Sequence, residues 1–247
     1  MADLRDPKTG CAWNREQTFQ SLIAYTLEEA YEVAEAQESA FDDPDKLMDE
    51  LGDLLLQIVF QSQIAKENGL FAFSDVVNAI ADKMVRRHTH VFGDETAATA
   101  DEVNRQWENT KAAERANSGH DSILDDVARA LPALTRADKI SRRTVRVGFD
   151  WPNIDRVYAK LREEIDEFEA EVEKNDQAAM HDEFGDILFT LVNIARWHKV
   201  DPEAALRDAN RKFERRFRNV EANADTPLSS LNADEWHALW LKAKNET

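Results

Sequence analysis

Acidic residues of this 247-residue chain repeat in one pattern at two places. The first set reads Glu28-Glu29-x-x-Glu32 and then Glu50-x-x-Asp53, and the second reads Glu163-Glu164-x-x-Glu167 and then Glu183-x-x-Asp186. Residues three or four apart share one face of a helix, so each set can direct several carboxylates at one small volume. Because such charges repel one another unless cations neutralise them, the pattern predicts a divalent metal site and, through it, phosphate chemistry.

Other motifs recur around these acids in the same order. Gly10-Cys-Ala-Trp13 precedes the first set, and Gly148-Phe-Asp-Trp151 precedes the second. A Lys/Arg pair and a Trp/Lys pair follow each set: Lys83 with Arg87 and Trp107 with Lys111, then Lys212 with Arg216 and Trp240 with Lys244. Chance is a poor explanation for so many motifs in register. The sequence therefore predicts two tandem domains, residues 1–118 and 119–247, divided at a turn-prone segment around Gly119.

The composition favours an all-α fold. Glycine (7) and proline (6) are scarce, and no stretch combines period-two alternation with a hairpin turn signal. Apolar residues recur at helical spacing, as in residues 51–59 and 187–194. A helix is predicted over residues 123–140, with Pro132 as a kink or break. We expect two helical bundles that bury apolar faces against each other about a pseudo-twofold axis, or against a second chain in a dimer.

The charge balance limits the partners of the chain. The net charge of 31 − 49 = −18 argues against general binding to nucleic-acid polymers or anionic membranes. The lone Cys11 fits a reducing compartment. The N-terminus lacks the apolar core of a signal peptide, and no apolar run approaches the roughly 20 residues of a membrane span. These features predict a cytoplasmic location.

The donor atoms of the acidic sets indicate which metal to expect. Carboxylates without histidine or thiolate favour Mg²⁺, with Mn²⁺ as a substitute, over zinc, and the Glu-x-x-His pairs of di-iron bundles do not occur. A single Glu-rich helix is most often a solvated face. Asp53 and Asp186 favour a ligand site over a solvated face. Each is followed directly by apolar residues, among which an unpaired carboxylate is costly to bury. After Asp186, Thr190 and Asn193 continue a polar stripe on an otherwise apolar helix.

Several other side chains could contact a phosphorylated ligand, and each has a plainer alternative. Lys212 and Arg216 share a helix face that could hold phosphate oxygens or balance acidic neighbours. Trp240 could stack on a nucleobase or fill a core or interface. Lys160, four residues before Glu164, either meets a phosphate or forms a helix ion pair.

These motifs resemble the two-domain form of the MazG family of nucleoside triphosphate pyrophosphohydrolases. The resemblance covers nearly the whole chain, and it is carried by Gly10-Cys-Ala-Trp-Asn14, Gln17-Thr18, Tyr25-Thr-Leu-Glu-Glu-Ala-Tyr-Glu32, Glu50-Leu-Gly-Asp53, Arg87-His-Thr-His-Val-Phe92 and Val147-Gly-Phe-Asp-Trp151. One departure is small: Ala12-Trp13-Asn14 stands where the family often has Pro-Trp-Asp. The resemblance implies an all-α dimer that depends on Mg²⁺ and hydrolyses nucleoside triphosphates (NTPs) to nucleoside monophosphates (NMPs) and pyrophosphate.

The resemblance also implies roles for individual residues. By position, the metal ligands are Glu164, Glu167, Glu183 and Asp186. The nucleotide or phosphate contacts are Lys160, Glu163, Asn193, Lys212, Arg216, Trp240 and Lys244. The expected catalytic residues are Glu163, Glu164, Glu167, Lys212 and Arg216. In the expected mechanism a metal-activated water attacks the α-phosphorus, Glu163 accepts its proton or holds a further metal, and the cations offset charge on departing pyrophosphate.

The two copies are not equivalent. Tyr25 and Phe60 of the first copy stand where the second has Lys160 and Asn193. Because both differences remove polar function and keep the acids, we expect the C-terminal copy to be the main catalyst. The N-terminal copy is expected to hold a second metal site, weak or structural, at Glu29, Glu32, Glu50 and Asp53.

Three functions are compatible with these residues. A pocket that relies on Trp stacking would tolerate every base, which predicts broad hydrolysis of NTPs and deoxynucleoside triphosphates (dNTPs). A narrower enzyme would act on dUTP or a modified dNTP. A regulator of another class would bind nucleotide through an acidic helical scaffold without cleaving it, and would show only a thermal shift with Mg²⁺ and NTP.

Overall fold

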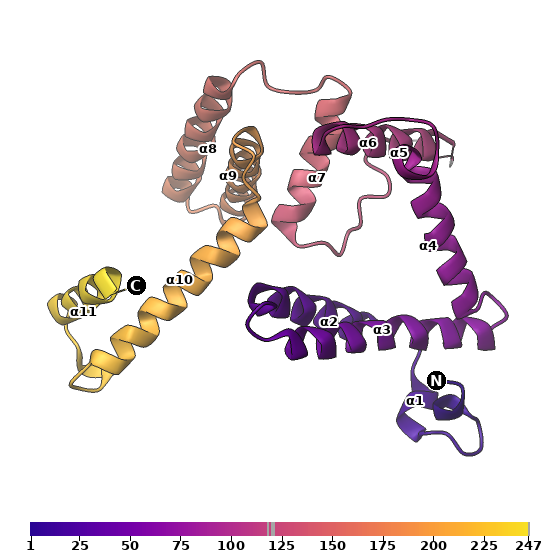
Figure 1. The fold of residues 1–247 in the computed structure, drawn as a ribbon. Helices are drawn as coiled ribbons and strands as arrows, with labels where there is room; N and C mark the ends of the chain where they lie inside the picture. The colour runs from indigo at the N-terminus through magenta and orange to yellow at the C-terminus, as the bar shows by residue number, and fades with distance from the viewer. Residues whose placement is uncertain (118, 120–121, 247) are drawn as a thin grey trace. The chain divides into compact units, whose positions relative to one another are not determined.

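A computed structural model of the chain describes residues 1–117, 119 and 122–246. These ranges contain helices and no strand, which confirms the predicted all-α fold (Figure 1). None of their helices combines the length and the apolar character needed to cross a bilayer. In chain order the elements are η1 (Asp3–Arg5), α1 (Ala12–Glu16), α2 (Ile23–Ala36), η2 (Gln37–Ser39), α3 (Pro44–Glu67), α4 (Phe73–Arg87), α5 (Thr89–Phe92), α6 (Ala100–Asn117), α7 (Ala133–Arg146), α8 (Ile154–Lys174), α9 (Gln177–Trp197), α10 (Pro202–Asn223), η3 (Leu228–Ser230) and α11 (Ala233–Glu246).

The described residues form two compact units that divide after Asn117. Each unit is built around a hairpin of two long helices, α2 with α3 in the first and α8 with α9 in the second. The sequence places the domain boundary between residues 118 and 119, and Ser118 lies outside the described residues.

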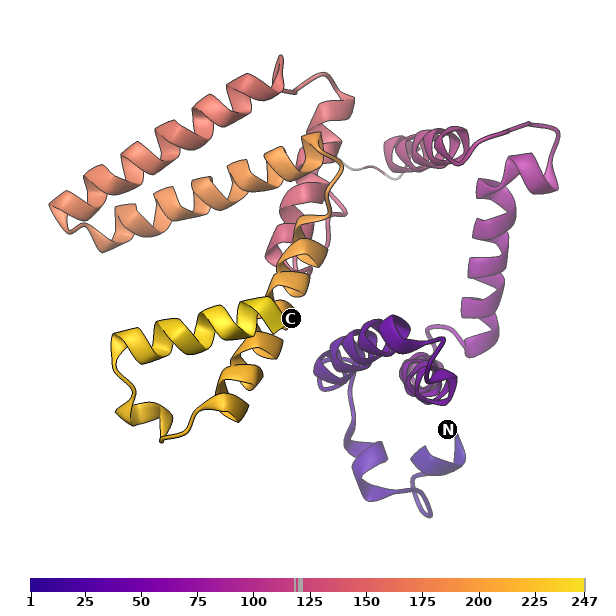
Figure 2. The same ribbon diagram turned by 60° about the vertical axis from the view of Figure 1, so that its left-hand side comes forward.

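The hairpin of the second unit is closed by a short turn (Figure 2). Asn175 follows α8 in the left-handed conformation, with φ 55° and ψ 36°, which asparagine adopts more readily than most residues. Asp176 then caps α9, and its carboxylate accepts hydrogen bonds from the backbone N–H groups of Ala178 and Ala179, both at 3.1 Å. Because the turn is short, α8 and α9 lie side by side and the acids on their facing sides meet.

The hairpin of the first unit is fixed by similar local chemistry. Asp43 caps α3 by accepting a hydrogen bond from the backbone N–H of Lys46 at 3.1 Å, and Pro44 occupies the first turn. Across the hairpin, Gln61 Nε2 donates to Thr26 Oγ1 at 2.9 Å. This polar contact and the local caps set the register of the two helices.

Helix α7 begins later than the sequence predicts. The predicted helix over residues 123–140 is wrong in its first part, because α7 begins at Ala133 and turns precede it. Asp126 has a left-handed φ of 67°, which ends any helix there. Pro132 has an extended ψ of 141°, so it stands outside the helix as its N-cap residue. Of the two roles predicted for Pro132, a kink inside the helix or a break, the structure shows the break: the proline stands just before the helix begins.

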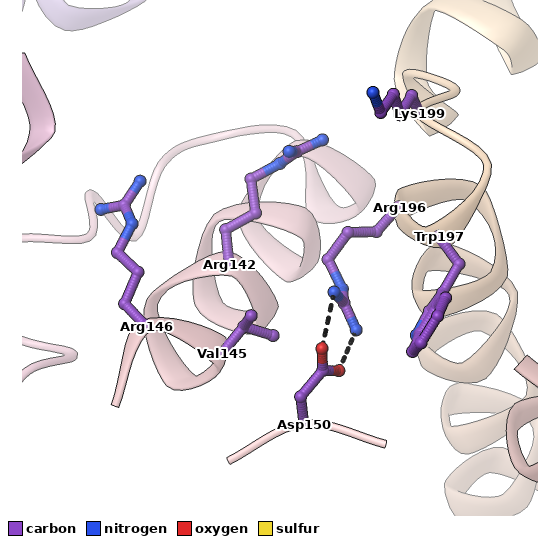
Figure 3. Close-up of a pocket in the computed structure, with 7 residues that line it drawn as sticks. All are labelled: Arg142, Val145, Arg146, Asp150, Arg196, Trp197 and Lys199. Carbon is purple, nitrogen blue, oxygen red and sulfur yellow. Dashed lines mark hydrogen bonds and ion pairs between the residues drawn. The ribbon is translucent and has the colours of Figure 1, made fainter. Parts of the chain in front are cut away.

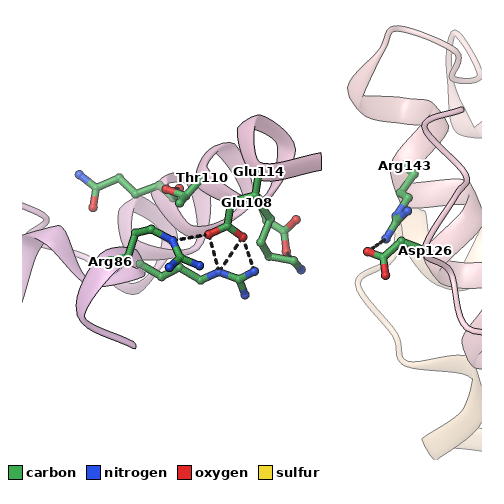
Figure 4. A network of polar contacts seen from close by, with 9 residues as sticks. Arg86, Glu108, Thr110, Glu114, Asp126 and Arg143 are labelled. Carbon is green, nitrogen blue, oxygen red and sulfur yellow. Dashed lines mark hydrogen bonds and ion pairs between the residues drawn. The ribbon is translucent and has the colours of Figure 1, made fainter. Parts of the chain in front are cut away.

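One carboxylate joins α4 to α6 in the first unit (Figure 4). Glu114 of α6 accepts hydrogen bonds from Arg86 Nε at 2.8 Å and from Arg87 Nη2 at 2.5 Å. The guanidinium of Arg87 also lies 5.0 Å from the ring centre of Trp107. The hydrogen bonds from Arg87 and Arg86 lower the pKa of the Glu114 carboxyl to about 2.

Glu114→Gln is expected to lower the thermal midpoint of the first unit at pH 7 by about 4 °C, which corresponds to about 1 kcal/mol in a domain of this size. The pKa of Glu114 is depressed on folding, so its stabilisation is complete above the unfolded value near 4.5 and is lost as pH falls towards 2. The difference from the wild type should therefore shrink below pH 4.5 in melts followed by circular dichroism. The control is Glu16→Gln, an exposed carboxylate of the same unit. A difference that stays constant down to pH 3 would contradict the assignment.

Candidate active site

Acidic side chains from two facing helices converge in the second unit. Glu164 and Glu167 lie on α8, and Glu183 lies on α9. Each offers a carboxylate oxygen such that all three atoms lie within 4.8 Å of one another. Glu164 is the buried member, with 4% of its surface exposed. The structure thus brings together three of the four predicted ligands, and the charge of the fourth, Asp186, acts on Glu183.

Lys160 lies against this acidic group. Its Nζ donates hydrogen bonds to Glu163 Oε1 at 2.7 Å and to Glu164 Oε1 at 2.9 Å, and it lies 3.7 Å from Glu167 Oε2. The hydrogen bonds that Lys160 donates to Glu163 and Glu164 raise the pKa of the lysine above its usual range. Lys160 therefore forms the helix ion pair that was the plainer of its two predicted roles. Its single ammonium offsets part of the charge of three carboxylates.

The remaining negative charge acts on Glu183. Burial raises the pKa of this carboxyl, and repulsion from Glu167, Glu164 and Asp186 raises it further. The acidic group of Glu164, Glu167 and Glu183 offers only carboxylate oxygens as metal ligands, and these carboxylates repel one another. Hard divalent cations prefer oxygen donors, so the residues present fit Mg²⁺ or Mn²⁺.

A cavity of about 510 Å³ opens beside the acidic group, with α7, α8 and α9 among its walls. We call it the catalytic cavity, after the role that we propose for it. Its polar lining includes Lys160, Glu164, Asp186, Thr190 and Asn193, and its apolar lining includes Ile140, Val145, Phe149, Trp151 and Phe189. A cavity of this volume with an apolar wall and few polar groups suits a small organic ligand.

Asn193 is buried in the wall of this cavity, and its amide is already oriented. Ser141 Oγ of α7 donates to Asn193 Oδ1 at 2.7 Å, and Asn193 Nδ2 donates to the backbone oxygen of Phe189 at 3.1 Å. The amide has one further N–H to offer a ligand. The sequence did not mark Ser141 or its cavity neighbour Thr144 as site residues. The signal that could have found them is their spacing of three on a helix, which places two hydroxyls on one face.

Four predicted nucleotide contacts lie on other elements. Lys212 and Arg216 belong to α10, and Trp240 and Lys244 to α11. None of them is among the residues that line the catalytic cavity in the described chain. Trp240 packs against Phe213 of α10, with ring centres 5.3 Å apart, so its packing role is visible. The nucleotide contacts of these four residues stay predictions.

The first unit has a matching acidic group. Glu29, Glu32 and Glu50 offer carboxylate oxygens within 4.8 Å of one another. Burial and then the charges of Asp53 and Glu32 raise the pKa of Glu29. Three of the four acids predicted as a second metal site thus come together, the charge of the fourth, Asp53, acts on Glu29, and all four offer only oxygen ligands.

Aromatic side chains occupy the positions that distinguish the two copies. Tyr25 and Phe60 both meet Trp13 edge-on, with ring centres 5.7 and 6.3 Å away. Phe60 is only 3% exposed. In the second unit the counterpart of Trp13 is Trp151, which lines the catalytic cavity. The first unit has therefore replaced an ammonium and an amide beside its acids with packed aromatic rings.

Comparison with known proteins identifies the family of the chain. The model of the MazG nucleotide pyrophosphohydrolase domain matches at residues 17–92 and again at residues 153–221, together more than half of the chain. The chain belongs to the MazG family. Each MazG match contains one hairpin and one acidic group, so the repeated motifs are explained by a duplicated MazG domain, and the predicted resemblance is confirmed.

Relatives of this MazG chain align along almost its whole length. It is 47% identical over 251 residues to the nucleoside triphosphate pyrophosphohydrolase of Escherichia coli (strain K12), which covers 100% of the chain and 95% of that relative. It is 41% identical over 247 residues to the nucleoside triphosphate pyrophosphohydrolase/pyrophosphatase MazG of Thermotoga maritima, covering 99% and 92%. A Mycobacterium tuberculosis nucleoside triphosphate pyrophosphohydrolase is 32% identical over 245 residues, covering 97% and 67%.

Proposed function

We propose that this MazG protein is a hydrolase that converts nucleoside triphosphates to NMP and pyrophosphate by attack at the α-phosphorus, mainly in its second unit. The observation that carries the proposal is that the acidic group and the catalytic cavity are continuous, since Glu164 belongs to both and Lys160 lines the cavity while it bonds the acids. The names of similar proteins support the same reaction class. A nucleoside triphosphate matches both features, because its base can pack on the apolar wall and its phosphates can bind a metal ion held by the acidic group.

Mg²⁺ is the proposed cofactor, with Mn²⁺ as its substitute. Glu164, Glu167, Glu183 and Asp186 would hold it through carboxylate oxygens alone. When bound, such an ion supplies a water of lowered pKa and neutralises phosphate charge. The hairpin of α8 and α9 contributes the fixed separation of the carboxylates, which come from both helices.

The other residues of the site have proposed roles of their own. Glu163 would accept the proton of the attacking water, since its side chain is 58% exposed and Lys160 already orients one of its oxygens. Lys160 would move its hydrogen bonds from carboxylate to phosphate oxygens when the substrate arrives. Lys212 and Arg216 would offset charge on departing pyrophosphate. Trp240 and Lys244 would contact the nucleotide.

The experiment that tests this function is a product analysis. The full chain is incubated with Mg²⁺ and each of a panel of NTPs and dNTPs, and nucleotides, phosphate and pyrophosphate are separated by ion-exchange chromatography. We expect NMP and pyrophosphate in equal amounts. Nucleoside diphosphate with phosphate would overturn attack at the α-phosphorus. Absence of all products, with only a thermal shift on adding Mg²⁺ and NTP, would favour the non-catalytic regulator.

The lining of the catalytic cavity favours broad base tolerance. Apolar side chains such as Phe149, Trp151 and Phe189 provide contact area that does not distinguish one base from another. The buried amide of Asn193 is the group that could read a base edge, and two hydrogen bonds already hold it. We therefore propose comparable rates across the panel. A preference above about 100-fold for dUTP or a modified dNTP would instead select the narrower enzyme.

We propose that the chain forms a homodimer through its hairpins. On α9, Phe184, Leu188 and Leu191 are 51, 40 and 44% exposed and lie on one helix face. Leu51, Leu55 and Ile58 repeat this exposed stripe at the matching positions of α3. An apolar stripe that recurs in both copies favours burial in an interface.

A further inference from the structure

A basic pocket of about 420 Å³ lies between α7 and the C-terminal end of α9 (Figure 3). We call it the Arg196 pocket. It is lined by Arg142, Val145, Arg146, Asp150, Arg196, Trp197 and Lys199. Four cationic side chains thus share one pocket with one carboxylate, in a chain of net charge −18. Cations gathered against the overall charge repel one another and attract an anion.

Arg196 is the buried centre of this pocket. Its side chain is 9% exposed, and its Nη1 and Nη2 donate to the two carboxylate oxygens of Asp150 at 3.4 and 2.5 Å. Its Nε is buried and has no hydrogen-bond partner among the described residues. The indole Nε1 of the adjacent Trp197 is likewise buried without an acceptor there. Buried donors without acceptors are unfavourable, so these two N–H groups point to a missing acceptor.

The remaining cations approach from two elements. Arg142 and Arg146 lie one turn apart on α7, and Lys199 follows the end of α9 with a left-handed φ of 57° (Figure 3). Arg142 also pairs with Asp138 at 2.6 Å, and 48% of its side chain stays exposed. Guanidinium groups bind phosphate oxygens through paired N–H donors, which a single halide cannot match. Arg146 also has an interaction of its own. A pocket lined by several guanidinium groups suits an anion with more than one phosphoryl group.

We propose that the Arg196 pocket binds a diphosphate group, either as free pyrophosphate or as the phosphates of a nucleotide, apart from the catalytic cavity. Such an anion competes with the Asp150 carboxylate for Arg196. Asp150 also lines the catalytic cavity, next to Phe149 and Trp151. Occupancy of the Arg196 pocket therefore changes the wall of the catalytic cavity. This site does not depend on the reaction proposed above.

The proposal is tested by calorimetric titration of the full chain with pyrophosphate in the presence of EDTA. Chelation removes divalent ions, so the acidic group repels pyrophosphate and the Arg196 pocket is left as an attractive site. Saturable binding is expected, weakened at least 10-fold in Arg142→Gln/Arg146→Gln. Asp150→Asn is expected to tighten binding several-fold, because it removes the charge that competes for Arg196. A gain in affinity cannot come from unfolding.

Two double variants separate this pocket from general charge effects. Arg162→Gln/Arg218→Gln removes the same charge from exposed helix positions and should leave binding unchanged. Lys212→Gln/Arg216→Gln tests the basic face of α10. Loss of binding in that variant but not in Arg142→Gln/Arg146→Gln would overturn the proposal, as would the absence of saturable binding. Titration with ADP distinguishes the sources: equal affinity assigns the phosphates of a nucleotide, and binding of pyrophosphate alone assigns the free anion.

Discussion

Glu164→Gln is expected to reduce hydrolysis of NTPs by at least about 100-fold while the protein stays folded. Loss of a residue that only supports a metal ligand typically costs roughly 10–100-fold, and Glu164 is itself a proposed ligand. Its carboxylate is buried and lies 2.9 Å from the ammonium of Lys160. Glutamine keeps the volume but removes the charge that holds a divalent cation. Initial rates of NMP release, with circular dichroism to confirm folding, measure the effect.

Glu29→Gln is the matched control, because Glu29 occupies the same motif position in the first unit. Its pKa is raised by burial and by the charges of Asp53 and Glu32, so removing the charge should relieve repulsion and leave the thermal midpoint unchanged or higher. Turnover should fall less than about twofold. Full activity in Glu164→Gln together with inactivity in Glu29→Gln would transfer the catalytic role to the first unit.

Leu188→Asp is expected to convert the proposed dimer to monomer at micromolar concentrations. Leu188 is the middle residue of the exposed stripe on α9. Fully burying a leucine contributes about 1.5–3 kcal/mol, so burying the 40% of Leu188 that is exposed contributes about 0.6–1.2 kcal/mol. A twofold interface contains the residue twice. Its loss, together with burial of a charge, should weaken association by about 1000-fold or more. Sedimentation velocity over a concentration series measures the shift.

The matched control for that experiment is Ala178→Asp. It adds the same charge at an exposed position in the first turn of α9, where the helix dipole favours acidic residues. This variant should sediment as the wild type does. If the wild type is a monomer at every concentration, or if Leu188→Asp does not change the sedimentation coefficient, the interface is not formed by this stripe.

The local part of this structure could be predicted from the sequence. Helix periodicity places Glu164 and Glu167 on one face, and a duplicated motif order reveals a duplicated domain, because both depend on residues close together in the chain. The sequence also shows that Tyr25 stands in the first copy where the second has Lys160. It does not show how the first unit fills that space, since only the folded unit shows Tyr25 and Phe60 packed on Trp13.

The non-local part could not be predicted in the same way. Motif order does not give distances. The family resemblance assigns Lys212 and Trp240 to the nucleotide, and in the described structure Trp240 packs on Phe213 and neither residue lines the catalytic cavity, so both assignments stay predictions. The contact of Ser141 with Asn193 joins residues 52 positions apart, and neither residue alone signals it. The start of α7 was missed because a proline can kink a helix or precede one, and the turn at Asp126 decides between them.

Lys160 gives the second unit a counter-ion that cannot diffuse away. The occupancy of the carboxylates by a free ion depends on the concentration of that ion in solution, whereas an ammonium tethered one helical turn away keeps a high and constant local concentration. We therefore expect the second unit to stay folded in medium poor in divalent ions. Among the described residues of the first unit, Tyr25 stands at that position and tethers no ammonium to the acids, so we expect this unit to depend on dissolved salt to screen the same charges.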